Sequence, residues 1–464
     1  MSEGSAPHRR RGDRSRPPAD LREYDALATR LAARVADVPP GEPIRLAKRT
    51  SNLFRARSTD RRHRLDARGL DRVFGVDPVA RTAEVGGMTT YERLVDATLP
   101  HGLSPLVVPQ LRTITLGGAV TGLGIESASF RNGMPHESVL EMDVLTGDGR
   151  VVTATPAGAH ADLFHGFPNS YGTLGYALKL TIELEPVLPY VHLRHRRYSD
   201  SGAYAEAIRA ATADPANDFV DGTVFGADDM VLTCGRYSAD APYTSDYTRR
   251  QIYYRSLTAR AEDHLTTHDY LWRWDTDWFW CSRAFGVQDP RVRRLVPRRL
   301  LRSATYWKLA ALERRYRLYA RLMREDPREE VVQDVDVPVG RLPEFLEFFH
   351  REIGISPVWI CPLRQRDPGA RWTLYDLDPA ELYVNVGFWS TVPLGPGRVD
   401  GHHNRLVEEE VTRLGGLKSL YSTAYYTAEE FDRLYNGVDY RVLKSGFDPA
   451  RRFPGLYEKC VQRG

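Results

Sequence analysis

VVPQLRTITLGGAVTGLGIESASFRNG (residues 107–133) is the most informative stretch of the chain. Its residues Gly117, Gly118, Gly122 and Gly124 fall within eight positions. Glycine lets backbone N–H groups approach a ligand closely and adopt positive φ angles, and proteins use such loops to bind pyrophosphate. The spacing matches neither the Rossmann fingerprint G-x-G-x-x-G nor the P-loop motif. On spacing alone, a tight turn with a close helix contact explains these glycines equally well.

A second glycine-bearing segment, FPNSYGTLGYALKLTIELEP (167–186), follows along the chain. Gly172 and Gly175 stand directly before an apolar run that predicts a strand. Between the two segments, VLEMDVLTGDGRVV (139–152) predicts a β-hairpin, because a Gly-Asp-Gly turn separates two apolar runs. Two glycine loops on either side of a hairpin favour a ligand-binding role for both.

The rest of the sequence predicts a leader followed by two domains. Residues 1–19, rich in Arg, Ser and Pro, are typical of a disordered basic leader. Residues 20–189 contain short strands punctuated by glycine and form the first expected domain. Residues 190–464 mix strands and helices without a regular βαβ order and form the second. This pattern predicts an α+β fold with two domains.

Composition and charge limit the function classes. The 464 residues carry 64 Lys plus Arg against 61 Asp plus Glu, and the resulting net charge of +3 is already present in the leader. A general nucleic-acid-binding protein is usually more basic, so no nucleic-acid partner is expected. Only six of the basic residues are Lys, which is typical of a GC-rich genome such as that of an actinobacterium.

The cysteine count and the hydropathy pattern bear on location. Four dispersed cysteines without zinc spacing indicate a reducing compartment and no metal site. No apolar run approaches 18 residues, so no membrane-spanning helix is expected. The sequence therefore predicts a cytoplasmic protein, either soluble or peripheral on the inner face of the membrane.

Together the motifs resemble flavoproteins of the vanillyl-alcohol-oxidase, or p-cresol-methylhydroxylase (PCMH), type. Within that superfamily they resemble the Δ24-sterol-reductase branch of seladin-like and Diminuto proteins. The resemblance runs in order from about residue 44 onward and implies a two-domain, PCMH-type FAD-binding fold with a C-terminal α+β substrate or cap domain. The matching motifs are TLGGAVTGLGIESASFRNG (115–133), DLFHGFPNSYGTLGYALKLTIELEPVLPYVHLR (162–194), DFVDGTVFGADDMVLTCG (218–235), VVQDVDVP (331–338), SPVWICPL (356–363), ELYVNVG (381–387) and YTAEEFDRLYNG (426–437).

The resemblance implies an FAD site made from both glycine segments and one earlier loop. KRTSNLFRAR (48–57) stands where the superfamily has its first phosphate-binding loop, but it departs from the usual R-G-x-G-H form and has no histidine to bond the flavin. Non-covalent FAD is therefore expected. The residues implied to contact it are Thr50, Ser51, Asn52, Gln110, Thr115, Leu116, Gly117, Gly118, Gly122, Gly124, Ile125, Glu126, Ser127, Gly172, Thr173 and Gly175.

The implied reaction, hydrogenation of an isolated C=C bond, requires a general acid, because no carbonyl polarises the alkene. The acid protonates one carbon while reduced FAD delivers hydride to the other. Glu126 is one candidate for the general acid, and its alternative role is that of a structural carboxylate that accepts hydrogen bonds from loop N–H groups. Tyr421 and Tyr425 are the other two candidates, and their alternative role is packing in the core. Asp334, in VVQDVDV, is interpreted as the end of a strand.

Two segments of the second domain bear on the substrate. YLWRWDTDWFWCSRAF (270–285) contains four Trp that would line a lipid channel, lie at a membrane interface or fill a core. Residues 291–324 carry twelve basic residues against one acid, together with an apolar stripe at helical spacing. Such a helix can dock on anionic lipid headgroups, and a solvated domain helix is the alternative.

The resemblance extends to actinobacterial reductases that convert a 10-methylene fatty acyl chain to a 10-methyl chain of the tuberculostearic type. It implies NADPH as electron donor, a phospholipid-bound acyl chain as substrate and a fatty-acyl methyltransferase in the same pathway. Three alternatives stay open: a Δ24-sterol or isoprenoid reductase, a flavin oxidase of an alcohol or sugar, and a non-enzymatic lipid-binding protein.

Overall fold

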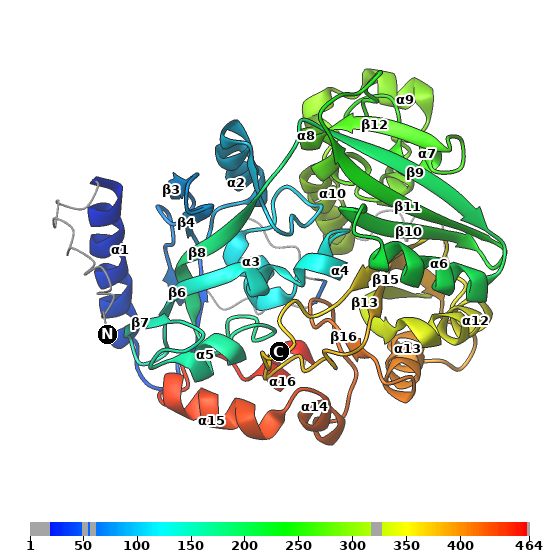
Figure 1. Cartoon of the computed structure of the whole chain (residues 1–464). Helices are drawn as coiled ribbons and strands as arrows, with labels where there is room; N and C mark the ends of the chain where they lie inside the picture. Colours follow the sequence, from blue (N-terminus) through cyan, green and yellow to red (C-terminus); the bar gives the residue numbers. More distant parts are fainter. Residues whose placement is uncertain (1–18, 49–53, 56–61, 317–326, 462–464) are drawn as a thin grey trace, which may run out of the picture.

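The computed structural model describes residues 19–48, 54–55, 62–316 and 327–461, and it contains two large antiparallel sheets (Figure 1). The first is six-stranded, with the order β3-β4-β8-β6-β7 and β5 paired to β8. Pairing of β6 with β7 confirms the hairpin predicted for residues 139–152. The bounds are β3 (Val73–Asp77), β4 (Thr82–Gly86), β5 (Leu103–Pro105), β6 (Val139–Leu145), β7 (Val151–Ala154) and β8 (Tyr176–Pro186).

The second sheet is eight-stranded, with the order β12-β9-β11-β10-β14-β15-β13-β16. Its strands alternate in sequence with helices, so the α+β expectation is confirmed. The expected boundary at residue 189 falls between β8 and β9. The bounds are β9 (Tyr190–Tyr198), β10 (Phe219–Gly226), β11 (Asp229–Ser238), β12 (Glu262–Thr266), β13 (Arg328–Pro338), β14 (Val358–Leu363), β15 (Tyr383–Pro393) and β16 (Leu417–Lys418).

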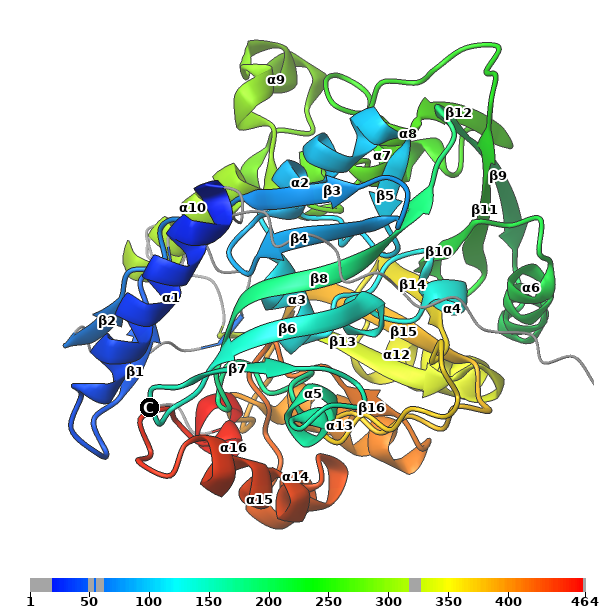
Figure 2. The ribbon, with the colours of Figure 1, turned by 60° about the vertical axis from the view of Figure 1, so that its left-hand side comes forward.

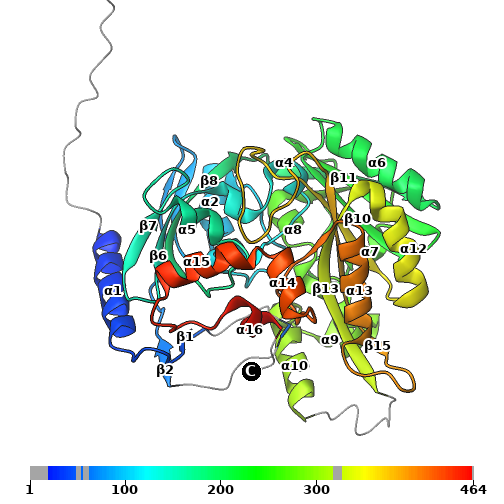
Figure 3. The same cartoon turned by 90° about the horizontal axis from the view of Figure 1, so that it is seen from below.

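Strand β13 has two different faces because side chains alternate along a strand. Val331, Val335 and Val337 pack into an apolar core with the helices α12 (Leu342–Glu352) and α13 (His402–Arg413). Figure 3 shows these two helices along one side of β13 and β15. Asp334 and Asp336 therefore face the opposite side, toward the first half of the chain.

The remaining elements are mostly short. A two-stranded parallel sheet pairs β1 with β2. The helices and small strands not yet given are α1 (Ala19–Ala36), β1 (Ile44–Leu46), β2 (His63–Leu65), α2 (Tyr91–Thr98), α3 (Leu116–Gly122), α4 (Ser129–Asn132), α5 (Ala161–Gly166), α6 (Ser201–Ala213), α7 (Tyr253–Ser256), α8 (Thr267–Leu271), α9 (Pro290–Leu295), α10 (Ser303–Tyr316), α14 (Ala428–Leu434), α15 (Gly437–Phe447) and α16 (Leu456–Cys460). Short 3₁₀ turns occur at Leu99–His101, Pro135–Ser138, Asp275–Asp277, Cys281–Phe285, Arg298–Leu300 and Val339–Arg341.

The C-terminal helices α15 and α16 return to the first half of the chain (Figure 2). The backbone N–H of Ile44 donates to the carbonyl of Arg452 at 2.8 Å, and the guanidinium of Arg452 donates to the carbonyl of Gly147 at 2.9 Å. Lys444 Nζ donates to the carbonyl of Thr173 at 2.7 Å. Residues 437–461 are thus tied to the glycine-bearing half of the molecule.

Two expectations fall partly outside the described residues. Residues 1–18 of the leader and residues 317–324 of the basic segment are among those not described. Within the described part, no helix combines the length and the apolar character needed to span a bilayer.

Candidate active site

A cavity of about 750 Å³ is lined by elements of both large sheets and by residues from Ile44 to Lys459. Backbone of the glycine segments forms one end, which we call the glycine end. Aromatic and acidic side chains form the other, which we call the aromatic end. The two ends differ in what they can bind.

The glycine end consists of α3 and the loop that follows it. The side chain of Thr115 caps α3 by accepting a hydrogen bond from the backbone N–H of Gly118 at 3.2 Å. A Cβ at Gly117 would lie 2.7 Å from the carbonyl oxygen of Gly87, and one at Gly124 would meet a proline ring at 2.8 Å. These positions leave no room for a side chain, so the main chain itself forms this wall of the cavity.

The structure describes thirteen of the residues expected to contact FAD, and it brings nine of them together at the cavity. These nine are Gln110, Thr115, Gly117, Gly118, Gly122, Gly124, Ile125, Gly172 and Gly175. The other four are buried without lining the cavity: Leu116, Glu126, Ser127 and Thr173. The remaining three expected contacts, Thr50, Ser51 and Asn52, lie outside the described residues.

Five basic side chains also line the cavity. Among its described lining residues, the two acidic side chains are Asp334 and Glu458. Burial, together with a neighbouring arginine, lowers the pKa of Lys459 to about 7. An excess of cations suits the phosphates of a dinucleotide. The segment 48–57, which the sequence predicts to bind phosphate, supplies Lys48 and Arg55. Sequence reasoning missed Arg45, Arg64 and Lys459, which lie outside the segments expected to bind the cofactor.

Glu126 sits in a buried ionic cluster rather than at the cavity surface. Its Oε1 lies 3.0 Å from Nη2 of Arg273, and the same nitrogen lies 2.8 Å from Asp221. Its Oε2 accepts hydrogen bonds from the backbone N–H and the hydroxyl of Ser127. Burial raises the pKa of Glu126, and Arg273 opposes that rise. This arrangement is that of a carboxylate that holds the loop after α3.

Asp334 and Tyr421 both line the aromatic end of the cavity. The indole N–H of Trp389 donates to the Tyr421 hydroxyl at 2.9 Å, which leaves the phenol O–H to donate toward Asp334. Burial and the neighbouring Asp336 hold the pKa of Asp334 well above its usual range. Burial and Asp334 likewise raise the pKa of Tyr421. Burial therefore favours the protonated form of both groups.

The interpretation of Asp334 as a strand end is wrong. Strand β13 continues past it to Pro338, and Asp334 pairs with Gly387 on β15. A Cβ at Gly387 would lie 2.6 Å from Oδ1 of Asp334, so the carboxyl group occupies the space above this glycine. Oδ1 has no hydrogen-bond partner among the described residues. A mid-strand carboxyl is thus held at the cavity with one oxygen free of protein partners.

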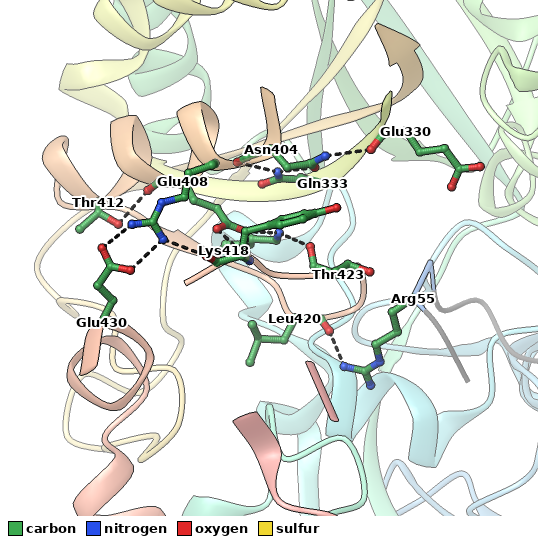
Figure 4. Close-up of polar contacts among 12 residues, drawn as sticks. Arg55, Glu330, Gln333, Asn404, Glu408, Thr412, Lys418, Leu420, Thr423 and Glu430 are labelled. Atoms are coloured by element: carbon green, nitrogen blue, oxygen red, sulfur yellow. Dashed lines mark hydrogen bonds and ion pairs between the residues drawn. The ribbon is translucent and has the colours of Figure 1, made fainter. Parts of the chain in front are cut away.

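Tyr425 belongs to the same loop as Tyr421 but lies away from the cavity. Its backbone N–H donates to both carboxylate oxygens of Glu408, at 3.1 and 3.0 Å. Figure 4 shows Lys418 beside the same carboxylate, where Nζ donates to Glu408 at 2.6 Å and to the carbonyl of Thr423 at 2.8 Å. This buried ion pair fixes both ends of the loop and so fixes which tyrosine faces the cavity.

The four Trp of residues 270–285 are all buried, so the membrane-interface alternative for them is wrong. Trp278 and Phe279 line the cavity, whereas the other three Trp fill the core. Both cavity residues have left-handed backbone, with φ of 45° and 60°. Such strain in two consecutive aromatic residues persists only where the surroundings impose it. The ring of Phe279 packs 4.5 Å from that of Trp389, which extends the apolar wall.

Comparison with known proteins agrees with this geometry. A family model described as an FAD binding domain matches residues 32–155, which include the first glycine segment and the hairpin. The chain is an FAD-binding oxidoreductase. The two-domain PCMH-type α+β fold expected from the sequence is therefore confirmed, and the glycine end of the cavity, with its basic lining, is where its residues fit FAD.

Curated relatives of this oxidoreductase include sterol reductases. The chain is 28% identical to the Delta(24)-sterol reductase of Rattus norvegicus, over 82% of this chain and 72% of the relative. It is 27% identical to the Delta(24)-sterol reductase of Homo sapiens, over 83% of this chain and 74% of the relative. A shorter match, 35% identical over 26% of each chain, is to the decaprenylphosphoryl-beta-D-ribose oxidase of Mycolicibacterium smegmatis.

Proposed function

We propose that this protein reduces an isolated C=C bond in a lipid, most specifically a 10-methylene fatty acyl chain to its 10-methyl product, with NADPH as the source of electrons. The observation that carries the proposal is the buried Asp334–Tyr421 pair at the aromatic end of a cavity whose other end fits FAD. The sterol-reductase relatives support C=C reduction. The Arg-rich composition and the resemblance in the glycine segment support the acyl substrate.

The chemistry divides between proton and hydride. When bound, FAD in its reduced form supplies a hydride to the more substituted alkene carbon, and NADPH returns two electrons to the oxidised cofactor. The protein must deliver the proton to the exocyclic CH₂, which becomes the methyl group. We assign that proton to a side chain, because an isolated alkene is a very weak base and water is too weak an acid to protonate it.

Asp334 is the better proton donor of the pair. Burial shifts the Asp334 carboxyl group toward its protonated form, and a carboxyl group is a stronger acid than a phenol whose pKa is also raised. The Tyr421 hydroxyl, fixed by Trp389, donates to the Asp334 carboxyl and stabilises the carboxylate left after transfer. We assign Asp334 as the acid and Tyr421 as the group that orients it.

The aromatic wall suits an apolar substrate. Trp278, Phe279 and Trp389 exclude water from the alkene, and their π faces favour the positive charge that develops at the tertiary carbon after protonation. None of the described lining residues is a His or Cys, the residue types that bond flavin covalently. This supports non-covalent FAD.

An anaerobic half-reaction tests the proposal. The flavin is first reduced with NADPH and then mixed with a phospholipid that carries a 10-methylene acyl chain, with the saturated 10-methyl lipid as control. We expect the alkene to oxidise the flavin, which is measured as the return of the visible absorbance of oxidised flavin. We also expect the 10-methyl chain to appear in mass spectra. No flavin oxidation by the alkene would overturn the proposal. In cells, loss of the gene should cause methylene-branched chains, the product of a fatty-acyl methyltransferase, to accumulate.

A Δ24-sterol is the second candidate substrate, favoured by the identity of the relatives. The same half-reaction with a Δ24-sterol and the methylene lipid in parallel separates the two, because the preferred alkene oxidises the flavin faster. An oxidase of an alcohol or sugar, the class suggested by the ribose oxidase match, would instead reoxidise rapidly in air and would be reduced by its alcohol substrate.

A further inference from the structure

The surface made by α9, the turn after it and the start of α10 has an unusual composition. Residues 290–310 contain no Asp or Glu. Five cations and four large apolar side chains of this segment are exposed, and we call them the α9–α10 surface. Its members are Arg291, Val292, Arg294, Leu295, Arg298, Arg299, Leu300, Lys308 and Leu309.

The apolar members are too concentrated to be ordinary surface residues. The described part of the chain has eleven exposed large hydrophobic side chains, and four of them fall between residues 292 and 309. Leu295, at the end of α9, is 85% exposed. Figure 2 shows α9 projecting from the body of the molecule. Isolated exposed apolar residues are common, but a cluster of them marks an interaction site.

The basic residues of the segment fall into two groups. Arg293 is buried and pairs with Asp277 at 2.6 Å, and Arg302 pairs with Glu92 at 2.6 Å, so these two anchor the segment to the domain. Arg298 donates to the hydroxyl of Thr248 at 2.5 Å and lowers the pKa of Asp269, so its charge is partly balanced. The other four outward cations have no ion-pair partner among the described residues: Arg291, Arg294, Arg299 and Lys308.

This surface adjoins the aromatic end of the cavity. Trp307, on α10 between Arg302 and Lys308, has its ring 4.5 Å from that of Phe54 and 5.3 Å from that of Trp278. Both partners line the cavity. The helix that carries part of the α9–α10 surface therefore also supports the wall against which the alkene is proposed to lie.

We infer that the α9–α10 surface docks on the anionic face of a lipid bilayer beside the aromatic end of the cavity. Leucine side chains enter the boundary between headgroups and acyl chains, while arginines bind lipid phosphates. A nucleic acid would satisfy the cations but would leave the apolar side chains exposed. The inference rests on the proposed function only for the identity of the lipid delivered.

Sedimentation of the flavin-loaded protein with vesicles tests the inference. One vesicle is pure phosphatidylcholine and the other contains 30% phosphatidylglycerol. We expect clear preference for the anionic vesicle, and at least a tenfold loss of that binding in R291E/R294E/R299E. The matched control, R22E/R30E/R34E on α1, changes the charge equally at exposed positions of a helix that also carries acids. It should bind within twofold of the unaltered protein.

The apolar contribution has its own variant pair. Leu295→Asp should weaken binding to anionic vesicles several-fold, whereas Val79→Asp, at a position that is 95% exposed in the turn between β3 and β4, should not. Unchanged binding by the triple variant, equal loss in its α1 control, or tighter binding to duplex DNA than to anionic vesicles would each overturn the inference.

Turnover of a detergent-dispersed alkene separates this inference from the proposed function. The triple variant should reduce dispersed alkene at the normal rate and lose activity only on vesicle-embedded substrate. If the unaltered protein binds anionic vesicles through this surface but reduces no alkene, the docking surface stands and the proposed function fails.

Discussion

The glycine end and the aromatic end of the cavity are built in opposite ways. The glycine end is main chain from two short segments, where added Cβ atoms would collide with neighbouring backbone or a proline ring. The aromatic end consists of side chains from β13, β15, a loop near residue 421 and the strained pair at residues 278 and 279. A cofactor can be recognised through local backbone shape, whereas a proton donor needs a particular environment assembled from distant residues.

This contrast predicts that substitutions at the two ends fail differently. Changes at the glycine end should remove the flavin. Changes at the aromatic end should leave the flavin bound and remove the reaction. The experiments below run from the largest expected effect to the smallest.

Gly117→Val should remove most of the bound flavin. Its side chain would meet the backbone carbonyl of Gly87, which cannot move without displacing the start of α2. We expect FAD affinity to fall by at least tenfold, consistent with an overpacking cost of roughly 1–3 kcal/mol. Flavin absorbance per mole of purified protein measures it.

The control for that variant is Gly446→Ala on α15, where an added Cβ has no heavy atom within 4 Å. It should retain full flavin and raise stability by roughly 0.5–1 kcal/mol, because alanine favours a helix. Full flavin in Gly117→Val would contradict the backbone-built site.

Asp334→Asn should nearly abolish alkene reduction while it preserves the flavin. Asn has the same shape but carries no acidic proton, and general acids typically contribute roughly 10²- to 10⁴-fold to rate. Single-turnover oxidation of the reduced flavin by substrate measures the loss. Reduction by NADPH should stay normal, since it needs no proton from Asp334. A loss below threefold would remove Asp334 from the mechanism.

The pH dependence of the same step should have one descending limb. Because the pKa of Asp334 is raised, the active, protonated form persists through acidic pH and is lost as pH rises through the apparent pKa of the Asp334–Asp336 pair. Burial also raises the pKa of Asp336, to about 6. Single-turnover rates between pH 5 and 9 test this, and Asp334→Asn should flatten the profile. A rate that rises with pH would contradict a carboxylic-acid donor.

Tyr421→Phe should slow alkene reduction by about tenfold, since it removes one hydrogen bond to Asp334 and that bond to a charged group is worth about 1.5 kcal/mol. It should also shift the descending pH limb upward, because the hydroxyl lowers the pKa of Asp334. Tyr425→Phe is the matched control from the same loop and should stay within twofold. Equal effects in both variants would mean that the loop acts only through packing.

The smallest effect concerns protons at the glycine end. With a pKa of about 7, Lys459 is mostly neutral at pH 8 in the free protein, and a nearby phosphate dianion would raise that pKa. FAD binding at pH 8 should therefore take up about one proton, and less at pH 6, where Lys459 is already charged. Titration calorimetry in buffers of different ionisation enthalpy measures the uptake. Lys459→Met should abolish it, and equal uptake in that variant would assign the proton elsewhere.

The sequence predicted the glycine end well because its signal is local. Gly117 and Gly124 lie in one glycine-rich segment that a reader of the sequence can pick out. The contacts that exclude a side chain at these positions, with Gly87 and Pro109, are visible only in the structure. Lys459 was missed because its contribution depends on the return of α16 to the first half of the molecule, which no local pattern indicates.

The aromatic end was only partly predictable. Tyr421 and Tyr425 are four residues apart in one loop and look alike in sequence. The buried pair of Lys418 and Glu408 decides which of them faces the cavity, and such a pair is visible only in three dimensions. The sequence indicated a strand end at Asp334 because charged residues seldom occupy the interior of a buried strand. Its placement at the cavity depends on the alternation of side chains along β13 and on the space above Gly387 of β15.

The return of the C-terminal helices has a consequence for how the holoenzyme is made. Pro454, Glu458 and Lys459 complete the wall of a cavity whose other walls come from residues as early as Ile44. During synthesis these residues leave the ribosome after every other part of that wall. The wall of the cavity is therefore complete only after the chain has emerged through Lys459, so full enclosure of the flavin comes later than synthesis of the first domain.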